Sequence, residues 1–121
     1  MQYLLLIYHN EPARLALTPD QEAAIYKEYR DLRQDLLNQG KFLGGNELKP
    51  TTTATTVRVR EGKQTVMDGP FAETKEQLGG YFLIEANDLD EAIAIAARIP
   101  SARNGSIEVR PIVASEQAAH P

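Results

Sequence analysis

Two segments of the chain are apolar at nearly every position, from Gln2 to Tyr8 and from Tyr81 to Ile84. Successive side chains of a strand point to opposite faces, so this pattern predicts central strands of a sheet that is covered on both sides. Two other segments, Thr56 to Arg60 and Ser106 to Ile112, alternate apolar and polar residues and predict strands with one solvent-facing side. Pro111 cannot donate a ladder hydrogen bond, which favours an edge position for the last strand.

Apolar residues recur with helical spacing in two further segments. Thr18 is a good N-cap with Gln21 as its capping-box partner, so a helix is predicted from Pro19 to Gln39. A second helix is predicted between the N-cap Asp88 and Pro100, which stops it. The buried stripes are expected to be Ile25, Tyr29, Leu32 and Leu36 in the first helix and Ala92, Ile93, Ala96 and Ile99 in the second.

The remaining pattern is weaker and predicts an edge strand, a hairpin and loops. Lys41 to Leu48 contains Gly44-Gly45 and is expected to be an edge strand with a bend. Gln64 to Met67 returns after the turn Glu61-Gly62-Lys63, which makes a hairpin with the strand before it. The loops are expected at His9 to Pro12 and at Ala72 to Leu78, where Gly79-Gly80 breaks any helix.

The order of these elements matches the split βαβ plan, with the two doubly apolar strands in the middle of the sheet. The predicted fold class is therefore α+β, a ferredoxin-like βαββαβ fold with an inserted β-hairpin. One domain is expected over residues 1–114, followed by a polar, flexible C-terminal tail at 115–121. Two helices cover one sheet face only, so we expect a homodimer through the helix-free face. The alternative is that the hairpin folds over that face within one chain.

Composition narrows the function classes. Thirteen Lys and Arg against seventeen Asp and Glu give a net charge of -4 without a basic run, which argues against a nucleic-acid partner. The chain has no cysteine and no run of about 20 apolar residues, so we expect no disulfide, no membrane span and a cytoplasmic location. His9 and His120 alone do not make a histidine metal site, and no metal or other cofactor is predicted, although a carboxylate site for Mg²⁺ or Ca²⁺ stays open.

A long motif carries a resemblance to a known family. The run Asp68 to Tyr81, which opens with Asp-Gly-Pro-Phe and ends with Gly-Gly-Tyr, resembles the signature of the DGPF proteins, a branch of the YCII-related family. The likeness continues through Asp88 to Ala92, Ile99-Pro100 and Gly105 to Pro111, and it includes Tyr3 to Tyr8.

The resemblance implies a dimeric α+β barrel. It also implies a candidate enzyme, since YCII-like proteins carry a paired His and Asp in a cleft, and a genomic link to sigma factors of the extracytoplasmic-function type. Aligned by its distance to the following glycine, Tyr29 holds the position of the family's histidine, and Asp68 would be the remaining partner.

The residues themselves leave two interpretations open for each candidate. Asp68 either caps a local turn or acts as a general acid or base in a cleft bounded by Pro70 and Phe71. Tyr29 either packs in the core or donates a hydrogen bond to a substrate or to Asp68. His9 lies after the first strand, where ligand sites gather, but is also typical of a solvated loop. Lys75 either is a solvated charge or binds an anionic substrate.

Two hypotheses follow. In the first, the protein is a cofactor-free enzyme that uses Asp68, Tyr29 and His9 as catalytic residues on a small molecule. In the second, it is a non-catalytic module that binds a small molecule or a protein, with a regulatory role linked to sigma-factor-dependent transcription. The position of Asp68 relative to a pocket, and to Tyr29 and His9, discriminates between them.

Overall fold

A computed structural model describes residues 1–114, and the predicted tail at 115–121 lies outside the described residues. The strands are β1 (Gln2–His9), β2 (Phe42–Glu47), β3 (Thr55–Arg60), β4 (Lys63–Asp68), β5 (Gln77–Glu85) and β6 (Ser106–Pro111). The α-helices are α1 (Glu11–Leu15), α2 (Pro19–Asn38) and α3 (Leu89–Ala97), and short 3₁₀ turns occur at Thr51–Thr53 and Pro100–Arg103. The chain is thus a mixed α+β protein.

Four strands form one antiparallel sheet in the order β2-β5-β1-β6. The prediction that the two doubly apolar strands are central is confirmed, because β1 and β5 lie in the middle. The predicted edge positions of β2 and of the proline-bearing β6 are also confirmed. In β6, Pro111 pairs with Tyr3 of β1 at the end of the ladder, where its missing donor costs little.

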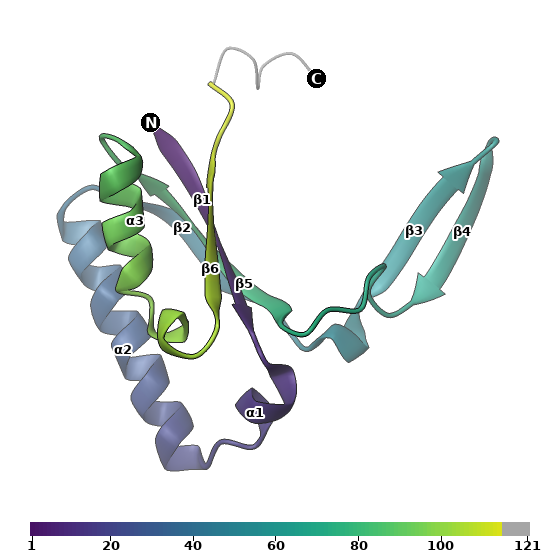
Figure 1. Ribbon diagram of the computed structural model, residues 1–121, viewed down its shortest axis with the longest axis horizontal. Coiled ribbons are helices and arrows are strands. Elements are labelled where there is room, and N and C mark those ends of the chain that lie inside the picture. Colours follow the sequence, from purple (N-terminus) through teal and green to yellow (C-terminus); the bar gives the residue numbers. More distant parts are fainter. Residues whose placement is uncertain (115–121) are drawn as a thin grey trace.

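The core lies between the sheet and the helices α2 and α3, which cover the same face (Figure 1). The odd-numbered residues of β1 point into it: Leu5 is fully buried and Tyr3 and Ile7 are nearly so. Leu32 and Leu36 of α2 are buried against them, as the stripe predicted. In α3 the stripe includes Ala92, Ile95, Ala96 and the following Ile99, whereas Ile93 is 50% exposed, so its predicted burial is wrong.

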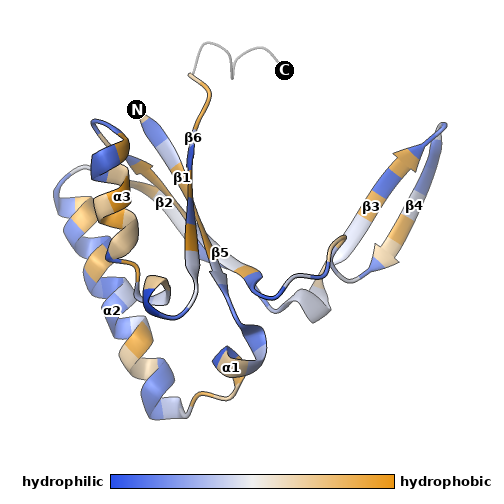
Figure 2. Cartoon of the chain, viewed as in Figure 1, coloured by the Kyte–Doolittle hydropathy of each residue, from blue (hydrophilic) through white to orange (hydrophobic). Residues whose placement is uncertain are grey.

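Strands β3 and β4 form a separate two-stranded sheet that projects away from the rest of the chain (Figure 1). The alternative in which this hairpin folds over the helix-free face within one chain is therefore wrong. Both faces of the hairpin are exposed, so the single solvent-facing side predicted for β3 is also wrong. Val57 and Val59 alternate with arginines along β3, and Val66 of β4 pairs with Val57; the three valines are 57%, 60% and 57% exposed. Figure 2 shows hydrophobic residues on both strands of the hairpin.

The face of the large sheet opposite the helices carries the even-numbered residues of β1. Leu4 pairs with Leu83 and Leu6 with Tyr81 of β5, and these side chains are partly exposed. Polar groups border them on β6, where the hydroxyl of Tyr8 donates to the Glu108 carboxylate. An apolar centre with a polar border thus lies on the face opposite α2 and α3, which no helix of residues 1–114 covers.

Two local features differ from the prediction and shape the site. Gly79 and Gly80 lie inside β5 rather than before it. The pairing of β1 with β5 skips Gly79, because Ile7 pairs with Gly80 whereas the next residue of β1 pairs with Leu78. The expected loop after β1 contains the helix α1 instead, whose N-cap Asn10 accepts a 2.9 Å hydrogen bond from the Ala13 N–H.

Candidate active site

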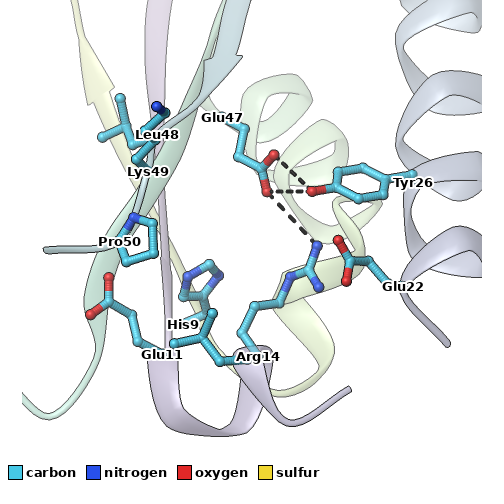
Figure 3. A pocket seen from close by; sticks show the side chains of 10 residues that line it. His9, Glu11, Arg14, Glu22, Tyr26, Glu47, Leu48, Lys49 and Pro50 are labelled. Atoms are coloured by element: carbon cyan, nitrogen blue, oxygen red, sulfur yellow. Dashed lines mark hydrogen bonds and ion pairs between the residues drawn. The ribbon is translucent and has the colours of Figure 1, made fainter. Parts of the chain in front are cut away.

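Three neighbouring cavities open at the carboxyl end of β1, and His9 and Arg14 line all three. The outer cavity has a volume of about 290 Å³ and lies between α1, α2 and the end of β2 (Figure 3). The inner cavity, of about 70 Å³, extends toward the core at Phe82 and Tyr29. A third, of about 150 Å³, lies toward Ser101. Together these cavities form what we call the His9 cleft.

The backbone places His9 at the cleft because the side chains of a strand alternate between faces. His9 points to the helix side of the sheet, as Ile7 does. It is the last residue of β1, two positions beyond the buried Ile7, and so lies just outside the core. The skipped residue Gly79 provides the room that the imidazole occupies, since a Cβ built at Gly79 would lie 2.6 Å from its Nε2 and even closer to Cε1. A glycine is therefore required beneath the His9 ring.

Helix α1 positions Arg14 and closes the cleft on one side. The carboxylate of Glu11 accepts hydrogen bonds from the Thr51 N–H at 2.8 Å and from the Thr51 hydroxyl at 2.6 Å. The backbone N–H of Glu11 donates to the side-chain carbonyl of Gln77 at 3.0 Å. Because α1 is only five residues long, these bonds to β5 and to the turn after β2 hold it in place.

Glu47, at the end of β2, connects α1 and α2 across the cleft (Figure 3). Its carboxylate accepts hydrogen bonds from the Tyr26 hydroxyl at 2.8 and 3.0 Å and lies 3.8 Å from the Arg14 guanidinium. The same guanidinium lies over the Tyr26 ring, 5.3 Å from its centroid. Burial, followed by the contact with Glu47, raises the pKa of Tyr26, so its hydroxyl stays protonated and a donor.

The protonation state of His9 follows from its surroundings. Burial in the cleft lowers the pKa of His9 below its usual 6.5, and the positive charge of Arg14 lowers it further. The carboxylates of Glu11 and Glu47 act in the opposite direction with smaller effect. The imidazole is therefore neutral at neutral pH, the form that accepts a proton.

Tyr29 reaches the inner cavity from α2, so the structure brings two of the three expected catalytic residues to one cavity. Its hydroxyl lies 2.7 Å from the Ser101 Oγ, and its ring packs edge-on against Phe82 with 6.1 Å between centroids. Burial raises the pKa of Tyr29, which keeps the hydroxyl protonated. Tyr29 is thus both a packing residue and part of the cleft wall.

Asp68 lies elsewhere, at the base of the projecting hairpin. It lines an open depression of about 460 Å³ with Pro70, and neither His9 nor Tyr29 takes part in that depression. The expected grouping of Asp68 with Tyr29 and His9 is not found within one chain. Phe71 is 76% exposed and Lys75 is also exposed, and neither lines any of the four cavities described.

The turn after Asp68 is closed by backbone groups. The Gly69 N–H donates to the Ala54 carbonyl at 2.7 Å, and the Thr56 hydroxyl donates to the Gly69 carbonyl at 2.8 Å. Gly69 has a φ of 94°, a conformation that L side chains rarely adopt, so the glycine after Asp68 is required by the turn. The catalytic and turn-capping roles expected for Asp68 both stay predictions.

Sequence reasoning missed Arg14, Tyr26, Arg33 and Glu47 as cleft residues. Arg33 had the clearest signal, because it follows Tyr29 by one helical turn and so lies beside the apolar stripe of α2. Arg14 and Glu47 lie in segments without periodicity, and only the folded chain brings them together. Within residues 1–114, no cluster of three or more His, Cys, Asp or Glu side chains is arranged to hold a metal ion.

The sequence over residues 1–116 matches the model of the YCII-related domain family. The chain belongs to this family. The uncharacterised protein R00369 of Rhizobium meliloti (strain 1021) is 39% identical to the chain over 114 residues, which cover 93% of this chain and 92% of that protein. The match to this YCII-related relative therefore extends over most of the chain.

A solved structure also resembles the YCII-related chain. It is 5-chloro-2-hydroxyhydroquinone dehydrochlorinase (TftG) from Burkholderia phenoliruptrix AC1100, in complex with 2,5-dihydroxybenzoquinone, with a TM-score of 0.49 and 17% identity. The match covers 97% of this chain and 98% of that chain. No helix within residues 1–114 is long and apolar enough to cross a membrane.

Proposed function

We propose that the protein is an enzyme that transfers a proton on a small molecule bound in the His9 cleft. The observation that carries the proposal is the convergence of three cavities on His9 and Arg14. A concave site with convergent polar groups and a titratable residue of shifted pKa is the usual setting of acid-base catalysis.

His9 is the proposed general base. Its imidazole is neutral at neutral pH because burial and Arg14 lower its pKa, and it is fixed over Gly79 at the mouth of the inner cavity. The Arg14 guanidinium provides donors on the opposite wall, where it lies 3.8 Å from the Glu47 carboxylate and over the Tyr26 ring. A substrate anion formed by loss of a proton to His9 is stabilised by such donors, which is how prearranged dipoles lower a barrier.

The experiment is a labelling reaction in D₂O. The protein is incubated with the small-molecule fraction of a cell extract, and mass spectrometry identifies compounds that are converted or that gain deuterium. We expect at least one such compound with the wild type and with Lys75→Gln, whose side chain lies outside the cavities described, and none with His9→Gln. Equal labelling by His9→Gln and by the wild type would overturn the proposal.

A second candidate function is binding without catalysis. It is favoured by the position of Asp68, which leaves His9 without a carboxylate partner from the Asp-Gly-Pro-Phe turn. In that case the same extract yields a compound that copurifies with the protein but is neither converted nor labelled. The regulatory link to sigma-factor-dependent transcription belongs to this candidate.

We also propose that the chain belongs to the DGPF branch of the family and acts in the cytoplasm. The support for the branch is the motif Asp68-Gly69-Pro70-Phe71. The positive φ of Gly69 explains why the second position of this motif is a glycine. The support for the location is the absence of cysteine from the sequence.

The proposed assembly is a homodimer with a ferredoxin-like, dimeric α+β barrel architecture, formed through the helix-free face of the sheet. Its support is the row Leu4, Leu6, Tyr81 and Leu83, which is partly exposed on the face opposite the helices within residues 1–114. The projecting hairpin adds to it, because an isolated two-stranded sheet with exposed valines is marginally stable in water. A two-fold partner covers both features with the same surfaces of each copy.

Light scattering after size-exclusion chromatography tests the assembly. We expect a mass twice that of the chain for the wild type and the mass of one chain for Leu83→Glu, which puts a charge at the centre of the face. Ile93→Glu is the matched control, because Ile93 is a half-exposed apolar residue on the helix side. A wild-type monomer at micromolar concentration would contradict the dimer.

A further inference from the structure

The inner cavity contains an arginine that forms no ion pair with an acidic side chain of residues 1–114. Arg33 reaches the cavity from α2, and its guanidinium lies over the Phe42 ring, 5.7 Å from the centroid. Its Nε is buried and has no hydrogen-bond partner, and within residues 1–114 Arg33 forms no ion pair with an acidic side chain. A buried polar atom normally has a hydrogen-bond partner, because removing it from water without one is costly.

The other groups of the inner cavity leave the positive charge unneutralised. Arg14 and Arg33 line it together with one carboxylate, that of Glu47, which is already bound to Tyr26 and close to Arg14. His9 is neutral at neutral pH. The inner cavity of this chain of net charge -4 is therefore cationic by one unit.

The outer cavity has the opposite net charge, so the charge of the cleft changes from negative to positive toward its inner end. Three carboxylates, those of Glu11, Glu22 and Glu47, line it against the cations Arg14 and Lys49. An anionic group is thus repelled at the entrance and attracted at the inner end. A ligand with one negative charge gains most when that charge lies against Arg33 and its neutral part lies outward.

We propose that the inner cavity binds the carboxylate of a small organic acid through the Arg33 guanidinium. This assignment rests on the proposed function, since it names the substrate class of the same cleft. The fork of donors on a guanidinium matches a planar carboxylate, and a space of about 70 Å³ lined by Tyr29 and Phe82 suits a group of that size. The bound acid then presents its next carbon toward His9 at the boundary between the two cavities.

The test uses benzoate as the probe and benzamide, its uncharged isostere, as the ligand control. Calorimetry and ¹⁵N NMR of the arginine Nε–H signals follow the titration. We expect benzoate to bind and to shift the Arg33 Nε–H signal, and benzamide to bind about tenfold more weakly or worse. Because the signal is read in the wild type, the test does not depend on whether a variant folds.

Matched variants separate this inference from the proposed function. Arg33→Gln is expected to weaken benzoate binding about tenfold or more, and Arg30→Gln, which removes an exposed arginine from the same helix, to leave it unchanged. His9→Gln should still bind benzoate, although it abolishes labelling in D₂O. Benzoate binding that is unaffected by Arg33→Gln, or no binding to the wild type, overturns the anion site, whereas labelling by His9→Gln overturns only the proposed catalysis.

Discussion

Replacing Gly79 with alanine should displace His9 and disable the cleft. The new methyl group would lie 2.6 Å from the imidazole Nε2, well inside van der Waals contact. The atoms that it meets belong to the His9 side chain, so we expect the imidazole to rotate away while the backbone stays in place. The matched control is Gly44→Ala in β2, where a Cβ has nothing within 4 Å.

The two variants isolate the cost of the clash. Both replacements reduce the conformational freedom of the unfolded chain and gain about 0.4–1 kcal/mol from it. Overpacking of this kind costs about 1–3 kcal/mol, and we expect the lower end because the imidazole can move. Denaturant unfolding should therefore show Gly79→Ala to be about 1 kcal/mol less stable than Gly44→Ala.

A double-mutant cycle with His9→Ala identifies the cause of this difference. Once the imidazole is absent, Gly79→Ala should cost no more than Gly44→Ala, which corresponds to a coupling of about 1 kcal/mol between Gly79 and His9. The His9 signals in NMR spectra of Gly79→Ala should also move from their wild-type positions. Unchanged His9 signals, or a cost that persists without the imidazole, would refute the placement of His9 over Gly79.

Three further predictions concern the same structure. Burial lowers the pKa of His9 in the folded state, so the unfolded state binds more protons once the pH falls below about 6.5. The free energy of unfolding should therefore decrease as the pH falls from about 6.5 through the pKa of the folded state. The variant His9→Gln should lack this contribution to the pH dependence. Tyr29→Phe should lose about 1 kcal/mol with its hydrogen bond to Ser101, measured by urea unfolding. Leu36→Ala should cost about 2–5 kcal/mol because Leu36 is fully buried, whereas Leu37→Ala, at 48% exposure, should change stability by less than about 0.5 kcal/mol in thermal unfolding.

The arrangement of the large sheet was predictable because its signals are local. The doubly apolar runs around Leu5 and Phe82 identify central strands, and Thr18 with Gln21 marks the start of α2 through side-chain bonds that the structure contains. The hairpin of β3 and β4 was predicted too, but its projection away from the large sheet was not. Its period-two pattern, with Val57 and Val59 on one side, is typical of a strand packed on a core, yet within residues 1–114 both valines are more than half exposed.

The site was harder to predict because it depends on one backbone irregularity and one short helix. His9 resembled a solvated loop residue until the skipped position at Gly79 placed its ring in a cavity. Helix α1 is too short for a periodic signal, so Arg14 had no predictable position. The available signs of a helix start were the capping residue Asn10 and Pro12 in the first turn. Asp68 was a candidate because of its Asp-Gly-Pro-Phe motif, but it is the last residue of β4 in the hairpin and lines a different cavity from His9.

The most direct test of the His9 cleft as the functional site is an NMR titration of the His9 imidazole with and without benzoate. The free protein should show a His9 pKa below 6.5, because burial and Arg14 disfavour the imidazolium. Bound benzoate should raise that pKa, since a nearby negative charge favours the protonated ring. An ordinary His9 pKa that benzoate leaves unchanged would contradict a desolvated, anion-binding cleft at the end of β1.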